Sequence, residues 1–252
     1  MKLLRTTTLV DTPPRVVSAA LTERALFGGD GVLAPGDELV LTGSRFRVAD
    51  LTVCGLRLVP VAGPLRVELL VRLAPTAAGT LVTATAASRT ALLGMALRRP
   101  LLTLLTSTVD GIRSRAGTLA GAAVVVGAAI VRERAVLAQQ RAYPATAAGR
   151  WELPGGRVEP TESDVDAVRR ECAEELGVDV RVGDPVGPDV ALGKDILLRV
   201  YRAELAEPGA VPHPYDHQAL RWLTAGRLGG VDWLPADRVL LAALRRLLAD
   251  TG

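Results

Sequence analysis

The sequence is poor in aromatic residues, cysteine and long apolar runs. Aromatic residues fill 3% of its 252 positions, so a hydrophobic core has to be built from Leu, Val and Ala. Its two cysteines, Cys54 and Cys172, match neither a disulfide framework nor the ligand spacing of a zinc site, which favours a reducing, cytoplasmic location. The longest apolar run, residues 119–131, is too short for a membrane-spanning helix, and the first residues lack the pattern of a secretory signal. We therefore expect neither a membrane protein nor a secreted one.

Charge is distributed unevenly along the chain. Residues 1–118 carry 14 Lys and Arg against 8 Asp and Glu, a net of +6, whereas residues 119–252 carry 16 against 19, a net of −3. Only Lys2 and Lys194 are lysines. The preference for Arg has two explanations, phosphate recognition or a GC-rich coding genome. Aromatic residues are not interleaved with the basic ones, so nucleic acid is not an expected partner. The contrast in charge predicts two domains, 1–118 and 119–252.

Residues 1–118 have the pattern of an α+β domain. A strand is expected at 2–10, and Asp11-Thr12-Pro13-Pro14 should then cap a short helix with Pro in its first turn. Turn sequences separate the next strand-like runs, which predicts an antiparallel meander. These runs are residues 37–43, 45–53, 65–73 and 79–87. Residues 89–116 are expected to form a long helix that Pro100 kinks.

This order of elements, with the phrase DTPPRVVSAAL at 11–21, resembles the START-like, or polyketide-cyclase-like (SRPBCC), helix-grip fold. The resemblance rests on element order and not on catalytic residues. It implies a long helix that closes over a cavity in the sheet. Two roles stay open for this domain: the cavity binds an apolar small molecule, or its own side chains fill it and the domain serves in docking or oligomerisation.

Residues 119–252 carry the more informative pattern. Strands are expected at 122–131 and 136–141, followed by a short strand that ends in the double glycine at 155–156. A helix should follow, capped by Thr161 or Ser163 and ended by Gly177. Its apolar stripe toward the core is predicted to consist of Val165, Val168, Cys172 and Leu176.

Three glutamates and an arginine crowd the second half of this helix. At about 100° per residue, Arg170, Glu171, Glu174 and Glu175 fall within an arc of roughly 140° beside the apolar stripe. Carboxylates so close together are stable only with a cation among them, and Mg²⁺ prefers oxygen ligands of this kind. Arg170 can orient a carboxylate through paired hydrogen bonds. On these residues alone, a metal site and a solvated charged face both stay open.

The wider spacing carries a family resemblance. Gly156, five residues, Glu162, seven residues and then RECAEELGV at 170–178 match the pattern GX5EX7REUXEEXGU, with Cys172 in place of a bulkier aliphatic residue. This half of the chain is similar to Nudix hydrolases. That resemblance implies an α/β/α sandwich with a mixed sheet and hydrolysis of a nucleoside diphosphate linked to another moiety.

The resemblance also implies a metal site and a set of catalytic residues. Mg²⁺, or Mn²⁺ in its place, would be held by Glu171, Glu174 and Glu175, with the carbonyl of Gly155 or Gly156 close by. One of the three glutamates could instead act as general base, and the sequence does not distinguish among them. Arg170 belongs to the same catalytic group, whereas Glu162 is expected to stabilise the helix or support the ligands.

Substrate contacts follow from a resemblance to the MutT-type and CTP-pyrophosphohydrolase-type branch, which cleaves nucleoside triphosphates to monophosphate and pyrophosphate. Three segments carry this resemblance: residues 149–160, 215–223 and 233–244. Asp216 would either join the metal site from a loop or cap a turn. Asp237 would accept hydrogen bonds from cytosine, guanine or 8-oxoguanine, cap the last helix, 237–248, or do both.

The remaining candidate contacts are weaker. Arg141 and Arg157 would bind phosphate or point into solvent, and Leu153 is expected to contact the substrate. His213 and His217 are predicted to lie in loops, and His217 would line the base pocket.

The favoured function is Mg²⁺-dependent hydrolysis of a nucleoside triphosphate, 8-oxo-dGTP or a CTP/dCTP-like nucleotide. The alternatives are a nucleotide- or ligand-sensing protein governed by residues 1–118, or a Nudix hydrolase of another nucleoside diphosphate derivative. The complete set of glutamates favours an enzyme, because a sensor need not retain every carboxylate. The motifs of NADH and ADP-ribose pyrophosphatases are missing from the sequence. Nothing in the sequence predicts the oligomeric state.

Overall fold

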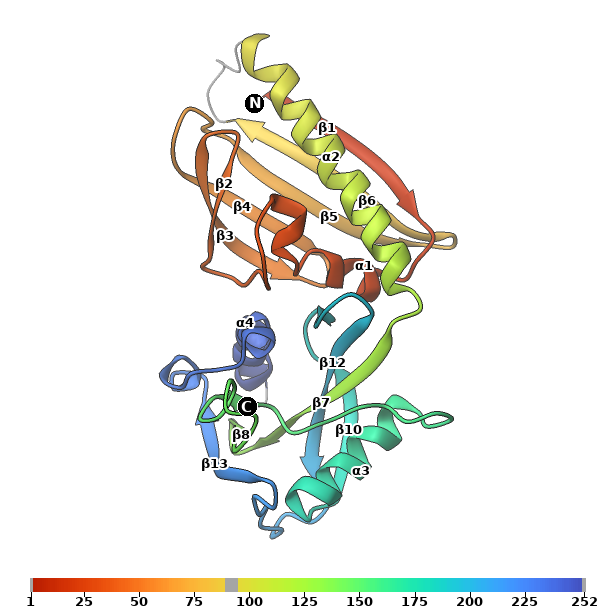
Figure 1. Cartoon of the computed structure of the whole chain (residues 1–252), viewed down its shortest axis with the longest axis vertical. Helices are drawn as coiled ribbons and strands as arrows, with labels where there is room; N and C mark the ends of the chain where they lie inside the picture. Colours follow the sequence, from red (N-terminus) through yellow and green to blue (C-terminus); the bar gives the residue numbers. More distant parts are fainter. Residues whose placement is uncertain (1, 89–94, 251–252) are drawn as a thin grey trace. The chain divides into compact units, whose positions relative to one another are not determined.

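The structure is a computed structural model that describes residues 2–88 and 95–250 (Figure 1). It divides into two compact units, and neither is one continuous piece of chain. The first consists of Met1–Ala122 and Pro188–Asp195, and the second of Ala123–Gly187 and Ile196–Gly252. Across the described ranges, no helix is both long enough and apolar enough to cross a membrane.

A six-stranded antiparallel sheet forms the body of the first unit. Its strands are β1 (Lys2–Val10), β2 (Glu38–Leu41), β3 (Ser44–Thr52), β4 (Gly55–Ala62), β5 (Glu68–Thr76) and β6 (Gly79–Ser88). They lie in the order β1-β6-β5-β4-β3-β2, so β2 to β6 form an antiparallel meander with one strand more than the sequence predicted, and β1 pairs with β6. Burial alternates along β2 and β6, which turns one face of each strand toward a core.

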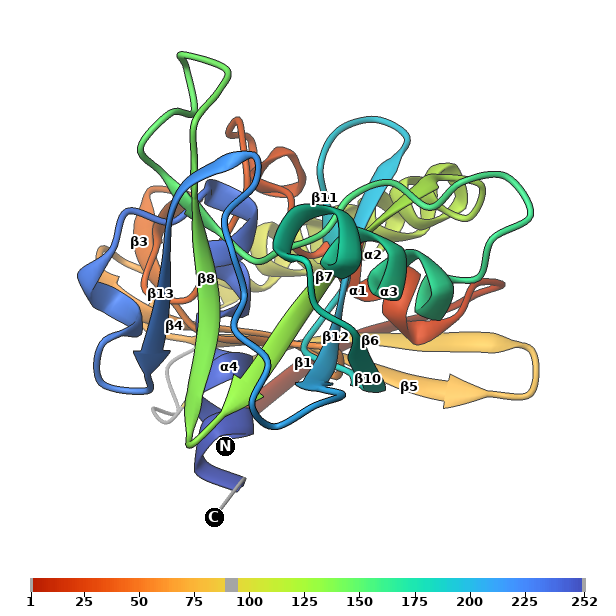
Figure 2. The same ribbon diagram turned by 90° about the horizontal axis from the view of Figure 1, so that it is seen from below.

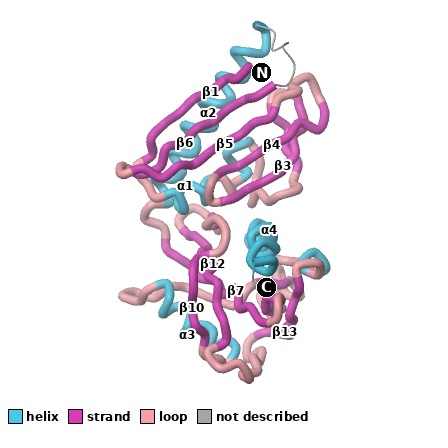
Figure 3. Tube along the Cα trace, turned by 180° about the vertical axis from the view of Figure 1, so that it is seen from behind, coloured by secondary structure: helices cyan, strands magenta, loops and turns pink. Residues whose placement is uncertain are grey.

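Helices pack against this sheet on one side. They are α1 (Pro14–Ala20), the 3₁₀ helix η1 (Arg24–Phe27) and α2 (Met95–Leu119). The long helix α2 runs across β1 and β6 and also contacts α1, as Figures 1 and 3 show from opposite sides. It contains Pro100 and continues three residues past its predicted end at 116. Residues 89–94, which we expected to begin this helix, lie outside the described residues.

Two expectations for this unit were wrong. No strand was predicted at β4, whose apolar residues are interrupted by Pro60. The side chains of Asp11 and Thr12 do not cap α1, because the N-cap residue is Pro13 and no side chain bonds there. Thr12 Oγ1 donates instead to the carbonyl of Asp11, 2.7 Å away. A proline does occupy the first turn of the helix, as expected.

The second unit is built on a mixed sheet. The strands of this half of the sequence are β7 (Ala123–Arg132), β8 (Ala135–Arg141), β9 (Trp151–Glu152), β10 (Val180–Pro185), β11 (Val190–Ala191), β12 (Ile196–Leu205) and β13 (His217–Thr224). The central order is β10-β12-β7-β8-β13, and β9 pairs with β8. β7 and β12 run parallel, whereas β8 pairs antiparallel with β7, β9 and β13.

Two helices and a short 3₁₀ helix complete this unit: α3 (Asp164–Leu176), η2 (Leu228–Gly230) and α4 (Pro235–Asp250). Figure 2 shows α3 in front of the sheet and α4 behind it. Ser163 caps α3 by accepting a hydrogen bond from the backbone N–H of Asp166, and Gly177 ends the helix in the left-handed conformation, φ 66°. Both ends agree with the sequence pattern.

The apolar side of α3 packs against β7. Its buried residues are Ala167, Val168, Cys172 and Leu176, and they share a core cluster with Val126, Ala128 and Ile130 of β7. Val165 is only half-buried, so Ala167 takes the place in the stripe that we predicted for it. Cys172 is buried and Cys54 exposed, and neither thiol is part of a disulfide.

β7 and β8 pair only next to their shared turn, through Val131 with Val136 and Arg132 with Ala135. Residues 154–158 then run along β7. The N–H groups of Ala128 and Val126 donate to the carbonyls of Pro154 and Gly156 at 2.7 and 2.8 Å. The chain therefore leaves β8 through β9 and brings the double glycine directly against β7.

The segment Pro188–Asp195 is part of the first unit although it lies far along the sequence. Arg15 donates to Oδ1 of the buried Asp189 through Nε (3.0 Å) and Nη2 (2.9 Å). The N–H of Ala191 donates to Thr22 Oγ1 at 3.2 Å. Arg115 donates to two carbonyls near the end of the segment. These bonds tie the segment to α1, to the residues after it and to α2.

Candidate active site

The double glycine between β9 and α3 is shaped by its neighbours. Gly155 has φ 152°, and a Cβ there would overlap with the carbonyl of Val126. A Cβ on Gly156 would overlap with the carboxylate of Glu171. Only glycine therefore allows both close approaches. The Gly156 carbonyl accepts the N–H of Val126 at 2.8 Å.

Arg170 lies at the centre of the charged cluster. Its Nε and Nη2 donate to the two carboxylate oxygens of Glu162, each at 3.0 Å. Its Nη1 donates to Glu171 Oε1 at 2.9 Å and to Glu174 Oε2 at 3.2 Å. These bonds raise the pKa of Arg170 and lower the pKa of Glu162. The guanidinium thus contacts three carboxylates, and it bonds Glu162 through the paired geometry that the sequence suggested for one carboxylate.

The three glutamates of the box differ in their surroundings. The Glu171 side chain is 13% exposed, and burial raises its pKa although Arg170 opposes the shift. The Glu174 side chain is 60% exposed. Glu175 is largely withdrawn from solvent, and its Oε2 accepts hydrogen bonds from Gln139 Nε2 and from the N–H of Gly155, both at 3.0 Å. Burial raises the pKa of Glu175 more than these bonds lower it.

The arrangement does not gather these carboxylates around one point. Across residues 2–88 and 95–250, no three His, Cys, Asp or Glu side chains form a group that could hold a metal ion. Instead, Glu171 and Glu174 face Arg170, whereas Glu175 faces Gln139. The donor set still fits a hard divalent ion, because carboxylates on one helix lie beside a glycine loop with no side chain to obstruct it.

Asp216 is exposed in the loop before β13. This loop is fixed to the end of α3, because the N–H of Tyr215 donates to the carbonyl of Glu175 at 3.2 Å and that of His213 to Leu176 at 2.9 Å. Asp216 therefore follows a residue that is bonded to the backbone of a box glutamate. His213 is exposed.

Asp237 is a buried residue of α4. It is the third residue of α4, which begins at Pro235, so it is not the N-cap that we considered. Its Oδ1 accepts the N–H of Leu153 at 3.1 Å, and Leu153 is itself buried. Burial raises the pKa of Asp237 to about 7, and the nearby Glu152 adds to the shift. Asp237 and Leu153, both predicted substrate contacts, are therefore neighbours.

Arg141, Glu152 and His217 form a second polar group. Arg141 Nη1 donates to both carboxylate oxygens of Glu152, at 2.9 and 2.7 Å, and its Nε donates to the carbonyl of Tyr143. Nε2 of His217 lies 3.0 Å from Glu152 Oε1. His217 is the first residue of β13, and its side chain is only 8% exposed, so its assignment to a loop was wrong.

Arg157, the other predicted phosphate contact, is exposed, and its backbone carbonyl accepts a hydrogen bond from Arg170 Nη2.

Two polar residues of this region were not among the predicted site residues. Gln139 is fully buried in β8 and contacts Glu175, and Glu152 links Arg141 to His217. Gln139 could have been noticed, since it interrupts a run of apolar residues in a strand predicted to be buried. Glu152 had no comparable signal, because its partners lie on other strands.

Comparison with known proteins identifies the family. Residues 121–251 match the NUDIX domain, and they make up just over half of the chain. A Mycobacterium tuberculosis protein named "Putative 8-oxo-dGTP diphosphatase 2" is 51% identical over 128 residues, covering 50% of this chain and 89% of that protein. The Escherichia coli CTP pyrophosphohydrolase is 34% identical over 125 residues, covering 50% and 93%. The solution structure of the E. coli ORF135 protein aligns with a TM-score of 0.45 and 32% identity, over 52% of this chain and 93% of that one. The chain therefore belongs to the Nudix hydrolase family.

Proposed function

We propose that the second unit hydrolyses a nucleoside triphosphate to the monophosphate and pyrophosphate, with 8-oxo-dGTP and CTP or dCTP as candidate substrates. The observation that carries the proposal is the complete box around the double glycine: Arg170 bonded to Glu162, Glu171 and Glu174, with Glu175 beside Gly155. The two relatives named above, which are named for reactions on 8-oxo-dGTP and CTP, support this substrate class.

Mg²⁺ is the proposed metal, with Mn²⁺ as a substitute. Glu171, Glu174 and Glu175 would hold it, together with the carbonyl of Gly155 and, from its loop, Asp216. When bound, such an ion neutralises phosphate charge and lowers the pKa of water so that a nucleophile forms at neutral pH. One of the three glutamates would accept the proton of that water.

The residues of the chain perform the remaining tasks. Arg170 keeps Glu171 and Glu174 in a fixed orientation through bonds of 2.9 and 3.2 Å. Glu162 anchors the guanidinium from the opposite side through two bonds. The carboxylates of Glu171 and Glu174 carry like charges and repel each other. The positive charge of Arg170 between them therefore stabilises the site in the absence of metal and substrate.

Recognition of the base is proposed for Asp237 and Leu153. The N–H of Leu153 fixes Oδ1 of Asp237 at 3.1 Å, so the carboxyl group has one orientation. A carboxylate there accepts hydrogen bonds from the exocyclic amine of cytosine or from N1–H and N2–H of guanine or 8-oxoguanine. His217 would line the same pocket. Arg157 and Arg141 are the two proposed phosphate partners. Arg157 is exposed, whereas Arg141 already bonds Glu152, so a phosphate would compete with that carboxylate for the guanidinium.

A panel of nucleotides tests this function. CTP, dCTP, 8-oxo-dGTP, dGTP and ADP-ribose would each be incubated with the full chain and Mg²⁺, and pyrophosphate and orthophosphate release would be measured separately. We expect pyrophosphate from at least one triphosphate, and none when EDTA removes the metal. Hydrolysis of ADP-ribose alone would overturn the triphosphate assignment, and no turnover of any compound would overturn the enzymatic one.

For the first unit we propose a helix-grip domain of the START-like class. Its element order supports the proposal, with a strand, two short helical segments, five strands in a meander and a long closing helix.

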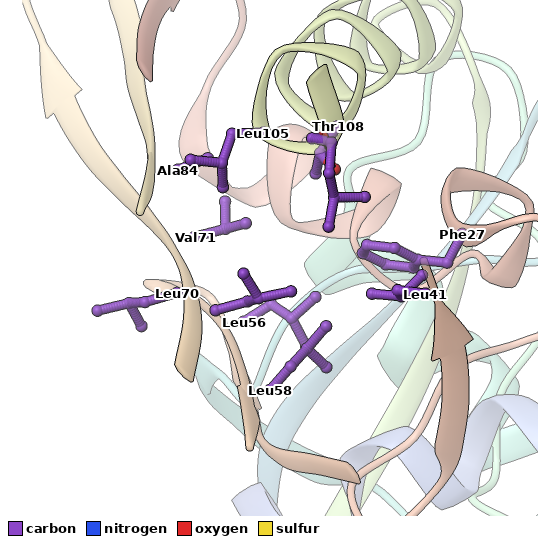
Figure 4. A pocket seen from close by; sticks show the side chains of 11 residues that line it. Phe27, Leu41, Leu56, Leu58, Leu70, Val71, Ala84, Leu105 and Thr108 are labelled. Carbon is purple, nitrogen blue, oxygen red and sulfur yellow. The ribbon is translucent and has the colours of Figure 1, made fainter. Parts of the chain in front are cut away.

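The cavity beneath α2 measures only about 20 Å³, and it is bordered by Phe27, Leu41, Leu56, Leu105 and other apolar side chains (Figure 4). That volume is close to the space of a single water molecule, which favours a domain filled by its own side chains over one that binds an apolar ligand. Saturable binding of an apolar fluorescent probe to the intact chain would contradict this.

A further inference from the structure

Three buried side-chain atoms within residues 2–88 and 95–250 have no hydrogen-bond partner: Gln139 Oε1, His217 Nδ1 and Arg202 Nε. The first of these atoms belongs to a residue that bonds the box glutamate Glu175. Folded proteins pair nearly all such atoms. A glutamine that is fully buried and satisfied at only one end of its amide therefore needs an explanation.

Gln139 lies in the middle of β8, opposite Glu152 on β9 and Leu220 on β13. Its Nε2 donates to Glu175 Oε2 at 3.0 Å, and the N–H of Gly155 donates to the same oxygen at 3.0 Å. Two donors from different elements thus converge on one carboxylate oxygen. Neither of them bonds Oε1 of Glu175.

We propose that Gln139 is a positioning residue for Glu175. Its amide and the N–H of Gly155 hold Oε2, so that Oε1 is the oxygen left for the divalent ion or for the water that attacks the phosphate. This inference rests on the proposed function of the site. Residues that orient the ligands of a metal in this way commonly determine how tightly the ion binds.

Packing alone does not require an amide at position 139. Methionine has nearly the same length and volume, and it would fill the space without burying a carbonyl oxygen that lacks a partner. A purely structural role therefore predicts that Gln139→Met leaves metal binding unchanged and does not reduce stability. The positioning role predicts the opposite for metal binding, because Glu175 loses one of the two donors that fix it.

The test compares the full-length wild type with Gln139→Met and Gln139→Leu, two apolar variants of different shape. Mn²⁺ binding, measured by electron paramagnetic resonance without nucleotide, should weaken by roughly 10- to 100-fold in both. With the best nucleotide of the panel, kcat should fall by about 10-fold or more while KM changes less than about twofold. A cooperative thermal unfolding transition in each variant serves as the check that the fold is retained.

Gln140→Met is the matched control. Gln140 is the next residue of β8, half-buried, and its side chain points to the other face of the sheet. Its Nε2 donates to the carbonyl of Gly149 at 2.8 Å and does not contact Glu175. We expect the Mn²⁺ affinity of this variant to stay within about twofold of the wild type, whatever happens to its stability.

The outcomes separate this inference from the proposed function. If a folded Gln139 variant binds Mn²⁺ and turns over nucleotide within twofold of the wild type, the positioning role is wrong and the enzymatic function stands. If Mn²⁺ binding depends on Gln139 but no nucleotide is hydrolysed, the inference stands and the function is wrong. A wild type that does not bind Mn²⁺ overturns both.

Discussion

The carboxylate of Glu171 lies against the Cα of Gly156, in the place that a Cβ would occupy. Gly156→Ala should therefore push Glu171 away from the double glycine. Since displacement of a catalytic group by about 1 Å can cost on the order of 10²-fold, we expect kcat/KM to fall by that order. Gly226→Ala is the control, because a Cβ there meets no atom within 4 Å. Equal activity of the two variants would show that the contact is unimportant.

Substitution of Glu174 and of Glu175 by Gln should have the same effect on turnover and different effects on stability. Both variants remove a proposed metal ligand, so each should lose roughly 10²-fold or more in kcat. The Glu174 side chain is 60% exposed, and its substitution should leave the melting temperature nearly unchanged. Glu175 is half-buried with a pKa that burial raises, so removing its charge should increase stability at neutral pH. Thermal melts alongside kinetics test both points, and normal turnover in both variants would refute the assignment.

The stability of the second unit should depend on pH through Asp237. Burial raises its pKa in the folded protein to about 7, from 3.8, with Glu152 raising it further and Leu153 N–H and Arg141 opposing the shift. Between these values the folded state keeps a proton that the unfolded chain has lost, so stability falls as pH rises. Asp237→Asn keeps the shape and an acceptor for Leu153 without the titration. Between pH 5 and pH 8, the wild type should lose on the order of 2 kcal/mol relative to this variant in urea unfolding. If the difference in unfolding free energy between the wild type and Asp237→Asn stays constant from pH 5 to pH 8, the raised pKa of Asp237 is contradicted.

Asp189→Ala should destabilise the first unit without reducing nucleotide hydrolysis. Asp189 is fully buried and accepts two bonds from Arg15, whose side chain is 27% exposed and can turn to solvent once its partner is lost. We expect a loss of about 1–3 kcal/mol in the free energy of unfolding. Asp110→Ala removes the exposed ion pair with Arg113 and should cost less than about 1 kcal/mol. Denaturant unfolding of the two variants measures the difference, and equal costs would show that burial of the Asp189 pair is unimportant.

Local rules predicted the parts of the site that depend on neighbouring residues. Ser163 and Gly177 fix the two ends of α3 because capping needs only residues a few positions apart. The spacing of Arg170 from Glu174 places them on one side of the helix, and the bond between them follows from that spacing.

Contacts between distant residues were not predictable in this way. The bond from Gln139 to Glu175 joins positions 36 apart, and the pair Arg15 and Asp189 joins positions 174 apart. Neither spacing has a periodicity that a single sequence reveals.

The start of the last helix was predicted two residues too late, which made Asp237 a candidate N-cap. This error was avoidable, because proline commonly opens a helix and Pro235 is the first residue of α4. β4 was missed because proline in a strand argues against one.

The placement of Pro188–Asp195 has a consequence for any attempt to divide the protein. A cut between Ala122 and Ala123 would yield two fragments, and the larger one would carry away a piece that the smaller one needs. The smaller fragment would lose the partner of Arg15 and the carbonyls that Arg115 binds. This break in the chain therefore does not suit the isolation of independent halves.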